Sequence, residues 1–401
     1  MVVLVAQQSL ALTMRATTVA PKRRYINLTG FPFPLGPFAV RRTTLETIVK
    51  DRVWGLEQEQ TLFGIRANTR MVAVKLRSGD LWVYNPVAPT RELVDLVSSL
   101  PFSGRVAHVV LGTTQYEHKI FAGPFARKFP EAAVHCVPDQ WSFPLDLPPR
   151  LVGIPTTRRA SAGPGILDPD AEYAFSDEFD FRLLRPESRL AGNYAAVEAA
   201  FVHKDTKTLV LTDALVNVPR APPRSLDPDA LAYLGRSDSW VLQAAALLNW
   251  RGQADALRAA ARERAKCGAR RGWERNALLA LTFGPSPESL IDPRPAFDKI
   301  SDRWLVAPVC QNLVYASDLV RPAVRRWVED VAKLDFVRLA PAHFAVARCS
   351  PAEFRRAFDP IFDEEDQRRP FWWQRQQPAF PQPDAQLITQ LAAGLKRFNI
   401  I

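Results

Sequence analysis

The first clear pattern of hydrophobic and polar positions lies between residues 71 and 100. Two runs of strand-like composition, MVAVKL (71–76) and LWVY (81–84), flank a short turn that contains glycine and aspartate, which predicts a β-hairpin. The next segment, TRELVDLVSSL (90–100), spaces its leucine and valine residues for one face of a helix. Thr90 precedes this face and has a side chain that caps helix N-termini. We therefore expect strand, strand and helix in succession.

The alternation of strand and helix continues beyond this helix. VAHVVLG (106–112) is an apolar run of strand length, FAGPFARKFP (121–130) predicts a short helix, and AAVHCVP (132–138) predicts a further strand. This β-α-β rhythm indicates an α/β domain whose sheet faces are covered. Glu117 and His118 lie in the connection between the first of these strands and the helix. Loops at such junctions often carry chemistry, because a rigid scaffold holds them in place.

The second half of the chain contains further strands, a helical region and proline-rich breaks. An apolar run (194–202) and the run TLVLTD (208–213) predict two strands, the second of which ends at Asp213. The segment DFVRLAPAHF (335–344) predicts a strand that runs into a loop carrying His343. The other expected features are loops at 151–175 and 219–229, helices within 230–283 and at 319–334, a break at 284–298, an irregular stretch at 360–385 and a closing helix at 386–398.

These patterns divide the chain into three parts. We expect residues 1–45 to be a targeting or disordered segment, residues 46–359 to form the main domain with a helical insertion at about 225–300, and residues 360–401 to be a C-terminal extension. The composition, 47% hydrophobic and 23% charged, is that of a globular protein. No apolar run approaches the roughly 18–20 residues of a membrane-spanning helix. Four scattered cysteines argue against a disulfide framework or a thiolate zinc site.

The net charge of +10 is concentrated in two segments. Residues 1–45 carry a charge of +6 without any acidic residue, and residues 251–275 carry +5, so the rest of the chain is close to neutral. The second segment contains RAAARERAKCGARRGWER, which could contact RNA. Its arginines are not interleaved with aromatic residues as a stacking platform requires, so a solvated helix face is the simpler interpretation. The acid-free N-terminus, with its arginine and hydroxyl residues, has the composition of an organelle transit peptide, and a disordered tail or a secretory signal are the alternatives.

Three loops at predicted strand ends carry side chains that can bind a metal. They hold Glu117 with His118, Asp213, and His343. Two imidazoles and two carboxylates suit a borderline divalent ion such as Zn, Fe or Mn. Taken singly, each residue is more often structural, so a metal site requires that the four converge. The remaining histidines, which we expect to be structural, are His108, His135 and His203.

Four segments give the chain a resemblance to a known family. GDLWVYNPVAPTRELVDLV, EHKIFAGPFARKFP, WSFPL and APAHF resemble the DUF4336 family, an uncharacterised branch of the metallo-β-lactamase superfamily found in photosynthetic eukaryotes and bacteria. The resemblance covers about residues 50–345. It implies an αββα four-layer sandwich with a metal site at one edge of its two sheets. Together with the N-terminal composition it implies a soluble chloroplast (plastid) protein, with a cytoplasmic or mitochondrial location as the alternative.

The resemblance also implies which metal ligands are present. Glu117 and His118 match the acidic residue and the last histidine of the superfamily's first loop. Asp213 matches an aspartate that ends a strand, and His343 matches the histidine of a late Pro-Gly-His. In the superfamily these four positions hold one of two metal ions. Asn85 stands where an early strand of the superfamily has aspartate.

The ligands of the other ion are missing. The positions of three superfamily histidines hold Thr113, Gln115 and Asn193, and none of these side chains offers an imidazole or a carboxylate. The resemblance therefore implies one intact half and one lost half of a two-metal site.

Two functions remain open at this point. The first is a hydrolase that uses a single Zn, Fe or Mn ion on an unknown small molecule, with the ion held by Glu117, His118, Asp213 and His343. In this function Asp213 is also the catalytic residue that orients the water. The second is an inactive descendant that serves as a binding or structural module in a plastid, in which the same residues form a structural polar cluster.

Overall fold

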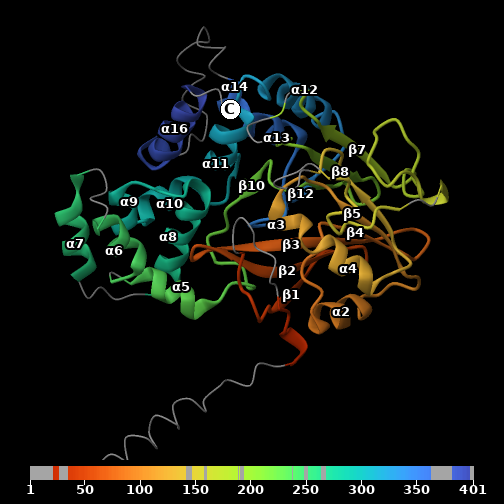
Figure 1. The fold of residues 1–401 in the computed structure, drawn as a ribbon, viewed down its shortest axis with the longest axis horizontal. Coiled ribbons are helices and arrows are strands. Elements are labelled where there is room, and N and C mark those ends of the chain that lie inside the picture. The colour runs from red at the N-terminus through yellow and green to blue at the C-terminus, as the bar shows by residue number, and fades with distance from the viewer. Residues whose placement is uncertain are drawn as a thin grey trace, which may run out of the picture.

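The fold is described here from a computed structural model. The structure describes residues 21–26, 35–140, 147–157, 160–187, 189, 194–236, 238–247, 252–262, 268–362 and 382–397. Two β-sheets lie face to face at the centre of the molecule, and helices lie on their outer sides (Figure 1).

The first sheet has six strands that pair in chain order. They are β1 (Thr43–Val49), β2 (Val53–Leu62), β3 (Ile65–Lys75), β4 (Leu81–Tyr84), β5 (Val106–Leu111) and β6 (Ala133–Cys136). The pairs from β1 to β4 are antiparallel, and β4, β5 and β6 run parallel because helices connect them. The predicted hairpin and the two strands that follow it are confirmed. The strands β1 and β2 and the first half of β3 were not predicted.

The second sheet has five strands in the order β13 (Ala347–Arg348), β12 (Arg338–Ala340), β9 (Thr208–Val210), β8 (Glu198–His203) and β7 (Phe179–Leu184). β12 pairs parallel with β9, and the other pairs are antiparallel. The parallel pair is important for the site, because the loops that follow β9 and β12 leave the sheet at the same edge. The predicted strands that end near Asp213 and His343 are confirmed.

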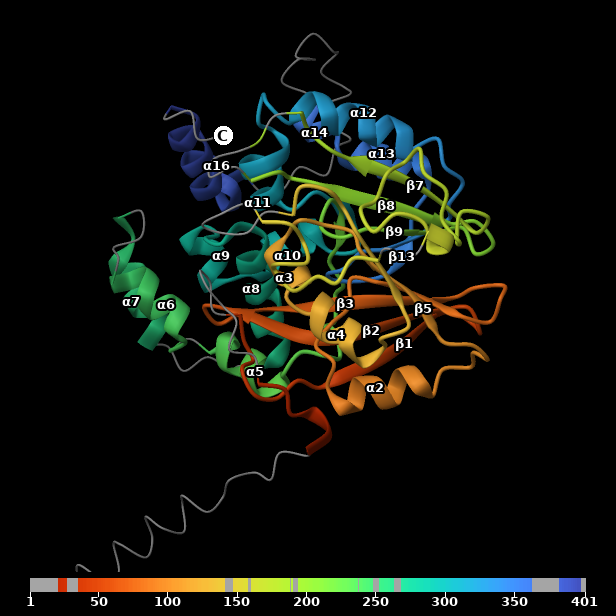
Figure 2. The same cartoon turned by 45° about the vertical axis from the view of Figure 1, so that its right-hand side comes forward.

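The two sheets pack through an aromatic and aliphatic core. Trp82 of β4 stacks on Phe179 of β7 with ring centroids 4.3 Å apart, and Phe201 of β8 packs beside it. The outer face of the first sheet packs against α2 (Arg91–Ser98) and α4 (Ala122–Lys128). The outer face of the second sheet packs against α12 (Arg321–Val331), α13 (Pro351–Ala357) and α14 (Asp359–Phe362), as Figure 2 shows. The predicted α/β class and four-layer αββα sandwich are confirmed.

A helical region lies between the two short strands β10 (Val216–Asn217) and β11 (Trp304–Leu305), which pair with each other. It gathers at one end of the sheets, on the left of Figure 1. Its helices are α5 (Pro228–Gly235), α6 (Trp240–Leu247), α7 (Ala254–Arg262), α8 (Ala269–Thr282), α9 (Pro287–Ile291) and α10 (Arg294–Ile300). At Gly272 of α8 an added Cβ would lie 1.6 Å from Leu231 O of α5, so only glycine permits this close approach.

Several predicted features of the irregular segments need correction. The expected break at 284–298 is wrong, because α9 and much of α10 lie there. The segment 151–175 is a loop as predicted, with one 3-10 turn, η2 (Ala160–Ala162). The closing helix, α16 (Gln382–Arg397), begins four residues earlier than predicted, and residues 363–381 lie outside the described part of the chain.

The described part of the N-terminal segment contacts the domain. Gly36 forms a bridge to Thr61 of β2, and Arg24 forms a bridge to Val40. The 3-10 turn η1 (Pro21–Arg23) packs beside α2, where Arg23 forms an ion pair with Glu92. Residues 1–20 lie outside the described part of the chain, so a targeting role for them stays a prediction. The division of the chain into three parts also stays a prediction.

Among the described residues, no helix combines the length and the apolar character that a membrane span requires.

Candidate metal centre

The ends of three strands bring the predicted site residues together. Glu117 and His118 lie on α3 (Tyr116–Lys119), a single turn that follows β5, so they belong to a short helix and not to an open loop. Asp213 follows β9, and His343 follows β12. The last two loops are joined, because Ala342 N donates a hydrogen bond to Thr212 O at 3.1 Å. The parallel pairing of β9 and β12 therefore places Asp213 beside His343.

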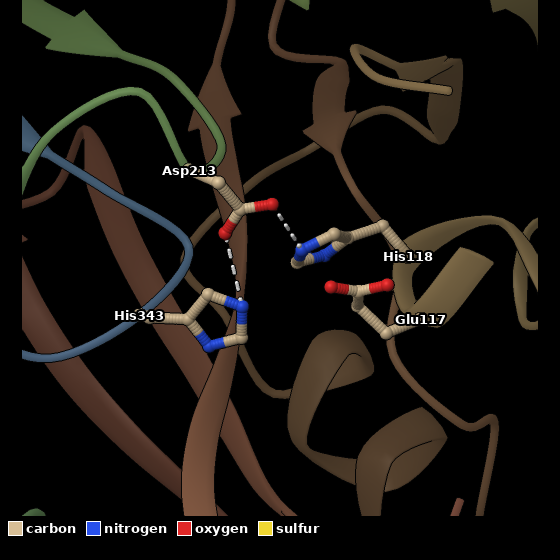
Figure 3. Close-up of side chains that lie close together, drawn as sticks. All are labelled: Glu117, His118, Asp213 and His343. Carbon is tan, nitrogen blue, oxygen red and sulfur yellow. Dashed lines mark ion pairs between the residues drawn. The ribbon is translucent and has the colours of Figure 1, made fainter. Parts of the chain in front are cut away.

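The four side chains form one compact group, which we call the four-residue cluster. One ligand atom from each of Glu117, His118, Asp213 and His343 lies within 4.8 Å of the others. Asp213 lies between the two imidazoles: its Oδ2 is 3.2 Å from Nε2 of His118 and its Oδ1 is 3.1 Å from Nε2 of His343 (Figure 3). The two ring centroids are 5.1 Å apart. Residues separated by more than 200 positions in the sequence thus share one site.

The hydrogen bonds of the two histidines show which ring atoms are available. Nδ1 of His343 donates to Asn68 O at 2.7 Å, so in the neutral ring Nε2 carries a lone pair that faces Asp213. His118 is buried, and among the described residues its Nδ1 has no hydrogen-bond partner, while its Nε2 faces Asp213 Oδ2 at 3.2 Å. Buried polar atoms without partners are rare and call for an explanation. A divalent metal ion bound by these donor atoms would explain them, so the residues fit such an ion.

The charges of the cluster act on one another. Burial alone would raise the pKa of Asp213, but His118 and His343 together hold it below its usual range. Burial alone would lower the pKa of His343, but Asp213 and the hydrogen bond to Asn68 O raise it above its usual value. The Asp213 carboxylate therefore remains ionised near neutral pH and attracts positive charge, whether from a protonated imidazole or from a metal ion.

A buried carboxylate supports the loop that carries Asp213, and the sequence did not reveal it. Oε1 of Glu198 on β8 accepts hydrogen bonds from the backbone N–H groups of Thr212, Asp213 and Ala214 at 2.7, 3.1 and 3.3 Å. Its Oε2 accepts a hydrogen bond from the Tyr315 hydroxyl at 3.3 Å. Burial raises the pKa of Glu198 to about 8, and the nearby Asp213 charge adds to this effect. The only available sequence signal was a glutamate inside an otherwise apolar strand.

Asn85 ties the chain before α3 and the loop that carries Asp213 to the first sheet. Its Nδ2 donates to Thr212 Oγ1 at 2.9 Å, and its Oδ1 accepts from the backbone N–H of Gly112 at 2.9 Å. Gly112 directly follows β5, before the α3 turn, and Thr212 immediately precedes Asp213. Asn85 itself has a φ of 47°, a left-handed conformation that asparagine tolerates better than most residues. A neutral amide can join these strand ends because it both donates and accepts hydrogen bonds.

Asn68 on β3 fixes the third loop. Besides accepting the bond from His343, it accepts from Phe344 N through Oδ1 at 2.8 Å and donates to Phe344 O through Nδ2 at 3.0 Å. Hydrogen bonds to the outer nitrogen of a ligand histidine orient the ring and fix its tautomer. The loop geometry at His343 is therefore set by three hydrogen bonds to Asn68, one to its backbone O and two to its buried side chain.

The lost half of the predicted site is occupied by structural contacts where the structure describes it. Thr113 is buried, its Oγ1 accepts from Gln115 N at 3.1 Å, and its backbone O accepts from Gln140 Nε2 at 2.9 Å. Gln115 is the residue at the N-cap of α3. Asn193 lies outside the described residues. The four-residue cluster is therefore the part of the predicted site that the structure brings together.

A cavity of about 990 Å³ adjoins the cluster. Glu117, Asp213 and His343 form part of its wall, and Glu198 also reaches it. Most of its other lining side chains are apolar. They include residues of the β2–β3 pair, of α8 and of the segment that contains α11 (Pro308–Cys310) and the π-helix η5 (Gln311–Tyr315). π-helical turns occur frequently at functional sites. The cluster thus opens onto a large apolar space.

The remaining histidines have structural partners, as expected. Nδ1 of His108 lies 3.2 Å from Nε2 of His135, and Nδ1 of His135 donates to Pro164 O at 2.7 Å. His203 belongs to a second group of metal-competent side chains, with Glu178 and Asp205. The two acids of that group already pair with arginines, Asp205 with Arg52 and Arg77, and Glu178 with Arg52. Bound guanidinium groups make this second group an ion-pair network, not a metal site.

Comparison with known proteins gives fold relatives of low sequence identity. A metal-soaked Flv1 flavodiiron core from Synechocystis sp. PCC6803 is 11% identical, with a TM-score of 0.43 over 81% of this chain and 62% of that chain. A flavoprotein from Thermotoga maritima is 11% identical, with a TM-score of 0.40 over 80% and 61%. The DIM-1 metallo-β-lactamase is 7% identical, with a TM-score of 0.37 over 80% and 97%. At these scores the similarities do not assign a function.

The family is shown by the sequence itself. None of the curated proteins matches the chain. The family described as "Domain of unknown function (DUF4336)" matches residues 50–295 and 291–360. The match covers well over half of the 401 residues, and the chain belongs to the DUF4336 family.

Proposed function

We propose that the protein is a hydrolase that binds one divalent metal ion in the four-residue cluster and acts on a small molecule. The observation that carries this proposal is the convergence of two imidazoles and two carboxylates, with Nδ1 of the buried His118 left without a hydrogen-bond partner among the described residues. Zn, Fe and Mn all suit such a donor set. A single ion is proposed because Thr113 and Gln115 have no strong donor to offer a second one.

The residues of the cluster have separate roles in this proposal. Glu117, His118, Asp213 and His343 would hold the ion, which when bound would supply a Lewis acid that polarises a carbonyl or phosphoryl oxygen and acidifies water. Asp213 lies between the two imidazoles, and its carboxylate would also orient a water molecule by accepting a hydrogen bond. Asn68 holds Nδ1–H of His343, which keeps Nε2 free as a donor atom.

A second candidate is an inactive protein in which the cluster is a structural ion-pair group. The raised pKa of His343 favours it, because a protonated imidazole would itself satisfy the Asp213 carboxylate. Such a protein would bind a small molecule or support an assembly without catalysis. It would contain no metal after purification without chelators.

The hydrolase proposal is tested by assaying metal-loaded protein on an activated ester, a thioester and a phosphodiester. Activity on at least one of the three that disappears in His118→Ala supports it. Activity equal in His118→Ala and in the unmutated protein would show that the cluster does not catalyse the reaction.

We also propose that the protein works in a plastid. The acid-free, arginine-containing N-terminus supports this location. Mass spectrometry of the native protein should find a mature chain that lacks Met1, and an intact Met1 would contradict removal of a transit peptide.

A further inference from the structure

The large cavity beside the cluster has apolar wall residues from several parts of the chain that are distant in sequence. Leu62 and Ile65 reach it from the β2–β3 turn, Leu281 from α8, and Leu313 and Val314 from η5. Its volume of about 990 Å³ is at the upper end of the roughly 300–1,000 Å³ found for small-molecule sites. A substrate of only a few atoms would leave most of this apolar space unfilled.

Charged groups are distributed unevenly over the walls. The acidic lining residues Glu117, Glu198 and Asp213 belong to the cluster or touch it, whereas the lining cations other than histidine are Lys119 and Arg127, on or beside the short helices that follow β5. A polyanionic strand would need several cations along its path. A ligand with one polar group at the cluster and an apolar remainder matches the walls better.

We infer that the cavity binds an acyl ester or thioester with a long apolar chain, with its carbonyl at the four-residue cluster. The inference rests on the proposed hydrolase function for its reaction, but the binding of the ligand's apolar chain does not depend on a metal. In hydrolysis the oxygen of water bonds to the carbonyl carbon, the bond from that carbon to the ester oxygen or thioester sulfur breaks, and the leaving group takes up a proton. The products are the carboxylic acid and an alcohol or thiol, and no oxidant or reductant is consumed.

Binding is measured first with 1-alkanols of four to ten carbons, which carry no charge and cannot be hydrolysed. Burial of each added methylene group should raise the affinity about threefold to fourfold, until the cavity is filled. An affinity that does not change with chain length, or the absence of binding, would overturn the inference.

Variants locate the binding to this cavity. Leu313→Trp places a bulky side chain in the cavity wall and should weaken binding of the ten-carbon alkanol at least tenfold. Leu319→Trp, a matched change at a half-exposed residue outside the cavity lining, should leave binding unchanged. Equal binding by the two variants would contradict the assignment.

Phe283→Asp provides an independent variant in case Leu313→Trp does not fold. Phe283 lines the cavity and is 48% exposed, and its φ of 57° is left-handed, a conformation that aspartate adopts more readily than most residues. The new carboxylate should weaken alkanol binding about tenfold without loss of the folded state. Unchanged binding by this folded variant would also contradict the assignment.

The His118→Ala variant separates this inference from the proposed hydrolase function. Alkanol binding should persist in His118→Ala even though metal binding and hydrolysis are lost. If alkanols bind with the expected dependence on chain length but no ester or thioester is cleaved, the cavity inference stands for binding and the hydrolase proposal fails. If short esters are cleaved but alkanols do not bind, the hydrolase proposal stands and the cavity inference fails.

Discussion

Oδ2 of Asp213 lies 3.2 Å from Nε2 of His118, a buried ring whose Nδ1 has no hydrogen-bond partner within the described part of the chain. Interior polar atoms are almost always paired, because an unpaired one costs about 1–3 kcal/mol. The fold nevertheless keeps these atoms close together, and Glu198, Asn85 and Asn68 hold the surrounding loops. A cation bound between the donors would remove the cost.

Metal binding should therefore stabilise the protein. Addition of Zn²⁺ at 100 times its dissociation constant should raise the free energy of unfolding by about 2.7 kcal/mol, and EDTA should reverse the increase. Thermal unfolding with and without the metal measures this. His118→Ala should unfold at the same temperature in both conditions, and a metal-dependent rise in this variant would show that the ion binds elsewhere.

Glu198 should act as a positioning residue for Asp213. Glu198→Ala leaves three backbone N–H groups without their acceptor, and we expect a loss of about 2–4 kcal/mol in unfolding free energy. Metal affinity should also fall about 10–100-fold, because the Asp213 loop loses its support.

Glu198→Gln is the matched control. It keeps an acceptor oxygen of the same shape, and a neutral side chain suits a site where burial raises the glutamate pKa to about 8. This variant should retain most of the stability and metal affinity. If Gln is as damaging as Ala, the negative charge matters more than the hydrogen bonds.

Acid should destabilise the fold through its buried histidines. Burial lowers the pKa of His108, His135 and His203 to about 4, with His135 adding to the effect on His108 and Arg52 to that on His203. Each histidine in the unfolded chain takes up its proton near pH 6.5, before the folded state does. The contribution of these histidines to the free energy of unfolding is therefore fully present above about pH 7. It is lost as the pH drops from about 6.5 to about 4.

The loss of unfolding free energy on acidification can be measured by urea unfolding at pH 7 and pH 5. The fall should be at most about 2 kcal/mol for each of the three histidines over this interval. His108→Gln removes one of the three groups and should make the fall smaller. Stability that does not change between these two pH values would contradict the account.

The part of the N-terminal segment that contains Arg41 should be needed for the stability of the fold. Arg41 is 1% exposed, donates to Glu59 O and Gly36 O at 3.0 and 3.3 Å, and lies 4.9 Å over the Phe121 ring. Removal of residues 1–42, or the single change Arg41→Ala, should lower the unfolding free energy by about 2–4 kcal/mol. A transit peptide that ended near residue 45 would be incompatible with such a loss.

The sequence predicted the elements whose signals are local. The N-cap Thr90 does accept the backbone N–H of Leu93 at 3.0 Å, and the apolar strand before Glu117 is buried. Strand β2 was missed because its run EQEQ looks solvent-exposed, yet all four side chains are buried. The reason is tertiary: Glu57 and Glu59 form ion pairs with arginines of β3 and accept hydrogen bonds from the segment that leads into α5.

The candidate site was predictable only in part for the same reason. Glu117, His118, Asp213 and His343 have the right donor types, but their convergence depends on the parallel pairing of β9 with β12 and on the packing of two sheets. Spacing along the chain does not contain that information. Glu198 was missed because its role, to accept three backbone N–H groups, becomes visible only when the neighbouring loop is in place.

The most direct test of the metal centre is elemental analysis of protein purified without chelators. We expect one ion of Zn, Fe or Mn per chain, none in His118→Ala or His343→Ala, and an unchanged value in Thr113→Ala. A value near zero for the unmutated protein would contradict metal binding and favour a structural cluster, and a value near two would contradict the single-ion site.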